Sequence, residues 1–195
     1  MPSKATRRRL RSLAIAGVLT GIACVVSNAF VLQAFNIPSR SMAPTLHVGD
    51  RVVVDKLAYY RAVPARGDVL VFEWTTGAST LSDGAELEAA PGPPRRGGRA
   101  SGAFIKRVIA VGGDTVEGWN GSVYVNGRRR SEPYLRAGTR TSSFGPVVVP
   151  ADHIFVMGDN RANSNDSRSF GPVPVRAVVG RALWLVWPPQ EVGTL

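Results

Sequence analysis

The sequence predicts a mainly β domain that follows one apolar N-terminal helix. From Leu13 to Phe35, 23 consecutive residues carry no charged side chain. After Phe35 the apolar residues fall into short runs bounded by Gly and Pro, which is the pattern of strands and turns. No second long helical pattern is present. The chain has 195 residues, 44% of them hydrophobic, which excludes a disordered protein.

The first segment, residues 1–12, is a basic head. The formal net charge of the chain is +10, from 24 Lys plus Arg against 14 Asp plus Glu. About half of this excess comes from five basic side chains in the head, which has no acidic residue. Basic residues in front of an apolar run predict a cytoplasmic N-terminus, and no nucleic-acid partner is expected. The five residues are Lys4, Arg7, Arg8, Arg9 and Arg11.

Residues 13–35 are predicted to form a single transmembrane helix. At about 1.5 Å per residue this helix would measure roughly 35 Å, which exceeds the roughly 30 Å hydrocarbon core of a bilayer. A cleaved secretory signal shares the basic head, but its apolar part is only about 7–15 residues long. We therefore expect a retained single-pass anchor in the plasma membrane, with residues 36–195 on the extracytoplasmic face.

Residues 36–195 are predicted to form one β-rich domain with a flexible insertion at about 75–103. The insertion contains little apolar material and is rich in Pro and Gly. Seven other segments have the alternating or continuous apolar pattern of strands. They are Arg51–Asp55, Asp68–Trp74, Phe104–Val111, Ser122–Asn126, Pro146–Val149, His153–Met157 and Ala177–Val186.

A metal site and a Ser-His-Asp triad both have little support in the sequence. The one cysteine, Cys24, lies in the apolar run, and the two histidines, His47 and His153, have no partner at a usual ligand spacing. A serine nucleophile without a histidine needs another base, and lysine is the established substitute.

Lys106 is the lysine that fits this role. The chain has only three lysines; Lys4 is in the basic head, and Lys56 ends a polar strand where a solvated lysine is ordinary. Lys106 lies inside an apolar strand, where alternation places it on the face of Phe104 and Val108. Desolvation there would lower its pKa from about 10.4 and make it a usable base. On this pattern alone, a strand lysine that extends its amine to solvent is the ordinary explanation, and it stays open.

Two further clusters carry polar side chains in unusual settings. Ser41 stands between Pro38 and Pro44, whose rings restrict the backbone, and only five residues separate it from the apolar run. Its hydroxyl is therefore expected near the membrane surface. The polar run Gly158–Arg168 follows an apolar strand directly, which suits an internal hydrogen-bond network that orients another side chain.

These three clusters together resemble the type I signal peptidases, membrane-bound Ser/Lys serine endopeptidases that remove signal peptides from exported proteins. The family's serine, lysine and final boxes are similar to Pro38–Leu46, Lys106–Asp114 and Gly158–Arg168, in the same order behind an N-terminal anchor. The resemblance implies a single coiled antiparallel sheet. It also implies cleavage after small residues at Ala-x-Ala type sites.

The resemblance assigns a role to each matching residue. Ser41 would be the nucleophile, and Lys106 the general base. Ser39 would complete the oxyanion hole with the Ser41 backbone N–H. Ser164 would orient the lysine amine, with a supporting network of Asp159, Arg161, Asp166 and Arg168. No metal or organic cofactor is implied; the partners would be preprotein signal peptides, membrane lipid and, transiently, the secretion machinery.

Three alternatives stay open at this point. A related Ser/Lys peptidase could be dedicated to one substrate, such as a pilin or a conjugation protein. A self-cleaving repressor-type protease shares a similar β core, but it needs a DNA-binding domain where this chain has an apolar span. A membrane-anchored binding module predicts no loss of function on replacing Ser41, and it leaves the three boxes unexplained.

Overall fold

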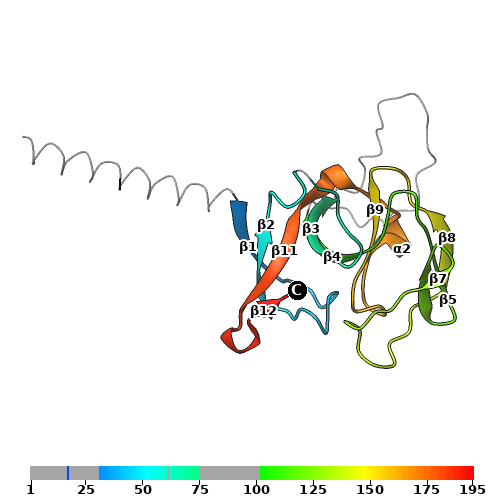
Figure 1. Ribbon diagram of the computed structural model, residues 1–195. Helices are drawn as coiled ribbons and strands as arrows, with labels where there is room; N and C mark the ends of the chain where they lie inside the picture. Colours follow the sequence, from blue (N-terminus) through cyan, green and yellow to red (C-terminus); the bar gives the residue numbers. More distant parts are fainter. Residues whose placement is uncertain (1–16, 18–30, 61, 75–101) are drawn as a thin grey trace, which may run out of the picture.

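The computed structural model describes Gly17 and residues 31–60, 62–74 and 102–195, which form two antiparallel sheets (Figure 1). The larger, curled sheet has eight strands in the order β1-β2-β11-β3-β4-β9-β10, with β12 paired to β11. Its strands are β1 (Leu32–Asn36), β2 (Arg51–Asp55), β3 (Val69–Trp74), β4 (Gly102–Val111), β9 (His153–Met157), β10 (Val173–Pro174), β11 (Val178–Trp187) and β12 (Gly193–Thr194).

The smaller sheet has four strands in the order β7-β6-β5-β8. Three short helical turns complete the described elements: α2 (Ser167–Phe170) follows β9, while η1 (Val175–Ala177) and η2 (Pro189–Glu191) flank β11. The strands of this sheet are β5 (Thr115–Trp119), β6 (Ser122–Val125), β7 (Arg128–Arg129) and β8 (Phe144–Val148). The expected single sheet is thus corrected to two.

Strand β3 lies inside the larger sheet and is buried on both faces, which explains its unbroken apolar run. Val69 and Val71 belong to one buried cluster, whereas Leu70 and Phe72 belong to another. Successive side chains of a strand point to opposite faces, so the part covered on both sides, Val69–Phe72, has no polar position. At about 25 cal/mol per Å² of apolar surface, this burial supplies much of the stability of the domain.

A third cluster joins the two sheets. Phe155 of β9 packs with Val116 of β5 and Val123 of β6, and none of the three is exposed. The ring of Phe144 from β8 stacks on Phe155 with 5.5 Å between centroids. The smaller sheet is therefore fixed to the strands β4 and β9 that frame the polar site described below.

All seven predicted strands are present, and β2 and β9 have the predicted bounds. The other five predicted strands differ by one or two residues at one or both ends. The sequence missed β1, β5, β7, β10 and β12. Three of these missed strands contain only two residues each, which is too short for a periodic signal.

Strand β1 corrects the end of the predicted transmembrane helix. Residues 32–35 lie in β1, which pairs antiparallel with β2 from Leu32 opposite Asp55 to Asn36 opposite Arg51. Apolarity alone does not mark where a helix ends and a strand begins, because β1 is specified by its pairing with a distant strand. No helix within the described ranges is long and apolar enough to cross a bilayer.

Three other predictions concern residues that are largely not described. The basic head of residues 1–12 lies outside the described residues, as does the predicted span before residue 31 apart from Gly17. Residues 75–101 of the predicted insertion are also outside them, while Gly102 and Ala103 belong to β4.

Candidate active site

Lys106 lies in the middle of β4, between strands β3 and β9. Its pairing partner on β3 is Leu70, and the residue is only 3% exposed. The side chain shares a face with Phe104, as alternation predicts, and Nζ lies 5.9 Å from the centroid of that ring. Burial in this apolar setting disfavours the charged amine and lowers the pKa of Lys106 from 10.5 to about 8.

Ser41 lies in the loop that connects β1 to β2. Fully buried Met42 and Leu46 pack in the core cluster beneath β2 and anchor this loop, and the Leu46 N–H donates to the Met42 carbonyl. The Asn160 N–H donates to the Ser41 carbonyl at 3.0 Å, and Asn160 Nδ2 donates to the Arg40 carbonyl at 3.1 Å. Core packing from one side and Asn160 from the other hold the Ser41 backbone in place.

Ser41 and Lys106 meet although 65 positions separate them in the sequence. Lys106 Nζ donates to Ser41 Oγ at 2.8 Å and to the Ile105 carbonyl at 2.9 Å. Ser41 is itself only 8% exposed. A buried amine with a depressed pKa, in contact with a serine hydroxyl, is a suitable pair for base-assisted nucleophilic attack.

The two accessory serines have different surroundings. The hydroxyl of Ser39 lies 3.2 Å from that of Ser41, on the exposed side of the pair. Ser164 Oγ is buried and has no hydrogen-bond partner among the described residues. The amine of Lys106 instead donates to Ser41 and Ile105, so the predicted contact between Ser164 and Lys106 is not formed in this structure.

Asp159 connects the three sequence clusters. Its carboxylate accepts two hydrogen bonds from Arg107, at 2.9 and 2.8 Å, and one from the hydroxyl of Thr45. Thr45 lies in the loop of residues 37–50, which we call the nucleophile loop after its candidate residue Ser41. Arg107 follows Lys106 directly, and its guanidinium stacks 4.0 Å from the ring centroid of Tyr134. Sequence reasoning missed both Thr45 and Arg107. Thr45 lies in the serine box and Arg107 in the lysine box, and these positions were the signal that could have indicated them.

Asp166 organises the turn that leads into α2. It caps this helix by accepting from the Arg168 N–H, and its side chain also accepts from Arg168 Nε and from the Gly158 N–H. Burial alone would raise the pKa of Asp166, but the hydrogen bonds and charge of Arg168 outweigh burial and hold it below the ordinary value. The negative charges of Asp166 and Asp159 partly oppose the effect of burial on Lys106.

Arg161 is fully buried and pairs with a residue that the sequence did not indicate. Its side chain donates to both carboxylate oxygens of Glu132 and, at 2.8 Å, to Thr141. The hydroxyl of Tyr134 also donates to Glu132 at 2.8 Å. Glu132 thus balances the charge of Arg161, whose supporting role at the site stays a prediction.

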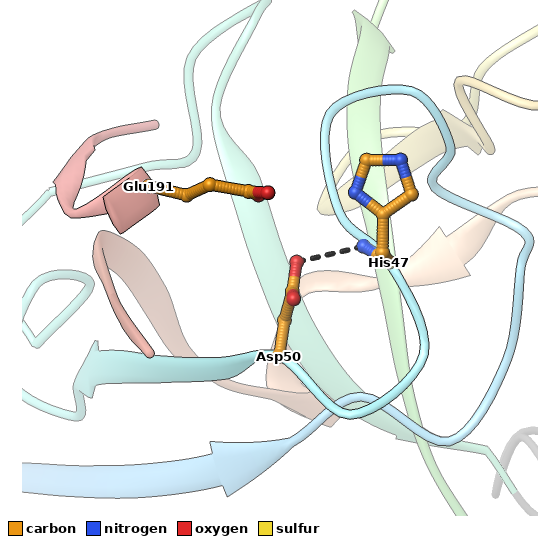
Figure 2. A group of neighbouring side chains, drawn as sticks. All are labelled: His47, Asp50 and Glu191. Atoms are coloured by element: carbon orange, nitrogen blue, oxygen red, sulfur yellow. Dashed lines mark hydrogen bonds between the residues drawn. The ribbon is translucent and has the colours of Figure 1, made fainter. Parts of the chain in front are cut away.

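Neither histidine contacts the hydroxyl of Ser41. His153 Nδ1 lies 2.8 Å from the Ala151 carbonyl. His47 lies in the turn before β2, where Asp50 and Glu191 are its neighbours (Figure 2). These three side chains are a candidate metal-ligand group that the sequence spacing did not reveal, because Glu191 is far away along the chain.

The sequence profile of the family described as "Signal peptidase, peptidase S26" matches residues 9–187. The chain belongs to this family. The resemblance seen in the three boxes is therefore confirmed, and this member of the signal peptidase family is a serine peptidase, a hydrolase.

Individual relatives agree with this assignment. Signal peptidase I of Mycobacterium tuberculosis (strain ATCC 25618 / H37Rv) is 37% identical, with 100% of this chain and 78% of that protein covered. Signal peptidase I of Leptolyngbya laminosa is 39% identical, with 85% and 74% covered. A crystal structure of a signal peptidase I from Enterococcus faecalis V583 overlaps 60% of this chain and 95% of that one, with 29% identity and a TM-score of 0.41.

Proposed function

We propose that this member of the signal peptidase family removes N-terminal signal peptides from exported preproteins with a Ser/Lys dyad. The observation that carries the proposal is the 2.8 Å hydrogen bond between Lys106 Nζ and Ser41 Oγ in a buried site. The relatives named signal peptidase I support the choice of substrate. Ser41 is the nucleophile, and Lys106 is the general base.

Acylation begins when neutral Lys106 accepts the proton of the Ser41 hydroxyl. Ser41 Oγ then forms a bond to the scissile carbonyl carbon, and the resulting oxyanion accepts hydrogen bonds from the Ser41 N–H and the Ser39 hydroxyl. The carbon–nitrogen bond breaks as protonated Lys106 gives its proton to the leaving amine. That amine is the new N-terminus of the mature protein.

Deacylation uses the same base. Lys106 accepts a proton from a water molecule, whose oxygen attacks the acyl carbon. The bond to Ser41 Oγ breaks, Lys106 returns the proton to that oxygen, and the signal peptide leaves with a free carboxyl group. Ser164 is proposed to hold the lysine amine in place during this cycle, which needs a local movement because Lys106 donates to Ser41 and Ile105 in the described structure.

The proposed setting is the extracytoplasmic face of the plasma membrane. The apolar residues that precede β1, 13–31, contain no charged residue and follow a basic head, which supports a single-pass anchor with a cytoplasmic N-terminus. The nucleophile loop follows β1 directly, so the dyad lies near the point where the anchor ends. Membrane lipid, signal peptides with small residues at Ala-x-Ala sites and, transiently, the secretion machinery are the proposed partners.

The test uses the full chain in detergent with a labelled preprotein that carries an Ala-x-Ala site. We expect the wild type to cut after this site, as read by N-terminal sequencing of the product. Ser41→Ala and Lys106→Ala should each lose about 10⁴-fold or more of kcat. Ser39→Ala should lose about 10²–10³-fold, the usual effect of one oxyanion donor.

Matched controls are available for both residues of the dyad. Lys56→Ala removes an exposed lysine and Ser143→Ala an exposed serine, and neither should change the rate. Cleavage that persists in Lys106→Ala would show that another base operates. A wild type that is inert on this preprotein would contradict general signal-peptide processing and favour a peptidase with one dedicated substrate.

A further inference from the structure

Three side chains of metal-ligand type converge away from the Ser41–Lys106 pair. His47 and Asp50 lie in the turn between the nucleophile loop and β2, and Glu191 ends η2 near the C-terminus. One ligand atom from each residue lies within 4.8 Å of the other two. In Figure 2 the carboxylate of Glu191 points from its own helical turn toward the imidazole and Asp50.

The three side chains form no hydrogen bond with one another. The single hydrogen bond among these residues runs from the His47 backbone N–H to Asp50 Oδ2, at 2.7 Å. The imidazole of His47 bonds to neither carboxylate in the described structure. Asp50 is only 4% exposed, and no Lys or Arg of the described ranges forms an ion pair with it. A bound cation would supply the counter-charge that the described residues do not give this buried carboxylate.

We propose that His47, Asp50 and Glu191 bind one divalent transition-metal ion, with Zn²⁺ as the best match to their chemistry. One imidazole nitrogen and two carboxylate oxygens suit Zn²⁺, which such atoms bind at about 2.0–2.2 Å. His47 and Glu191 are exposed, so their side chains are free to close around the ion. The His47 N–H fixes the orientation of the Asp50 carboxylate, as outer hydrogen bonds do in metal sites.

The position of the site indicates a structural role rather than part in the peptidase reaction. Asp50 is anchored by its backbone, since its N–H donates to the His47 carbonyl and its own carbonyl accepts from the Ile37 N–H. An ion there links η2 to the turn that ends the nucleophile loop. Metal binding to the folded state alone stabilises that state by mass action.

The test measures Zn²⁺ binding to the full, untagged chain in detergent by calorimetry, together with the Tm. A Cys24→Ser background removes the one cysteine, which is itself a zinc ligand type. We expect one ion per chain and a rise in Tm that a chelator reverses. His47→Ala and Glu191→Gln should each weaken binding by at least about tenfold.

His153→Ala is the matched control, because it removes the other histidine of the chain and leaves the three ligands intact. This variant should bind Zn²⁺ as the parent does. Absence of saturable binding would overturn the proposal, and so would binding that either His47→Ala or Glu191→Gln leaves unchanged. Neither readout depends on cleavage, so this test stands apart from that of the peptidase function.

Discussion

Among single residues, Lys106 shows most directly how burial changes the acid–base behaviour of a side chain. An exposed lysine is protonated at neutral pH and cannot accept a proton from a serine. Lys106 is 3% exposed, and burial lowers its pKa to about 8 although Asp166 and Asp159 oppose the shift. A fraction of the molecules therefore holds a neutral amine beside Ser41 near neutral pH.

The cleavage rate should follow the titration of Lys106. We expect kcat/KM to rise with pH through about 8, because deprotonation of the amine creates the base. Asp166→Asn removes a charge that raises this pKa and should move the midpoint to lower pH. The measurement is kcat/KM from pH 5 to 10 on one preprotein; a flat profile would refute the assignment of Lys106 as the base.

The same residue should limit the stability of the fold. Below pH 8 the buried amine is charged and costs up to about 3 kcal/mol, from a pKa lowered from 10.5 to about 8. Between about pH 8 and 10.5 the native amine is neutral while the unfolded one is still protonated, so this cost disappears as pH rises. Lys106→Met should therefore be inactive yet more stable below pH 8.

Denaturant unfolding of wild type and Lys106→Met at several pH values checks this expectation. The advantage of the variant should shrink from pH 8 to 10.5, because the wild type no longer carries the buried charge there. Lys56→Met, at an exposed position, should show no such pH dependence. An advantage that is the same at every pH would contradict the assigned cause.

At the scale of elements, the segment from β9 to α2 packs closely against the loop that carries Ser41. Gly158 follows β9 directly, and a Cβ there would collide with Ser164 Oγ and the Ser41 carbonyl. The Ser41 carbonyl is backbone and is held by its hydrogen bond from Asn160, so it does not move aside readily. Only glycine fits this contact.

Gly158→Ala should reduce activity more than stability. The added methyl group must displace Ser41 or Ser164, and a shift of about 1 Å in a reacting group costs about 10²-fold in rate. Single-turnover cleavage and thermal melts measure the two effects. Gly193→Ala, whose Cβ would meet its nearest atom at 3.8 Å, is the control and should alter neither. An active Gly158→Ala would show that the close contact is not needed.

For the whole molecule, buried ion pairs tie the two sheets together. Glu132 lies between β7 and β8 of the smaller sheet, and its partner Arg161 follows β9 of the larger one. The Arg161 side chain has no exposed surface, whereas Arg181, which pairs with Asp68, is 46% exposed. Removing one partner of a buried pair leaves an uncompensated charge, whereas an exposed pair contributes little.

Glu132→Gln should therefore lower the free energy of unfolding by about 3–5 kcal/mol. The glutamine keeps the size of the side chain but not the charge that balances Arg161. Arg181→Gln, in the exposed pair, should cost less than about 1 kcal/mol. Urea unfolding of the three proteins checks both values, and equal losses would contradict the difference in burial.

The sequence by itself determined the mainly β class, seven strands and the family, and it singled out Ser41 and Lys106, which the structure places in contact. Apolar runs in strands such as β3 reflect burial directly, so they are readable without a structure. The three boxes are local in sequence, and their order was sufficient to indicate the family. The apolar runs and the boxes are each contained in a short stretch of chain.

Tertiary structure alone decided which distant residues meet. The pairing of β1 with β2, the Asp159–Arg107 and Arg161–Glu132 ion pairs, and the group of His47, Asp50 and Glu191 each join segments that no local pattern connects. A charged residue has the same identity whether it is solvated or buried against a partner. Its role therefore follows from the neighbours that the fold supplies.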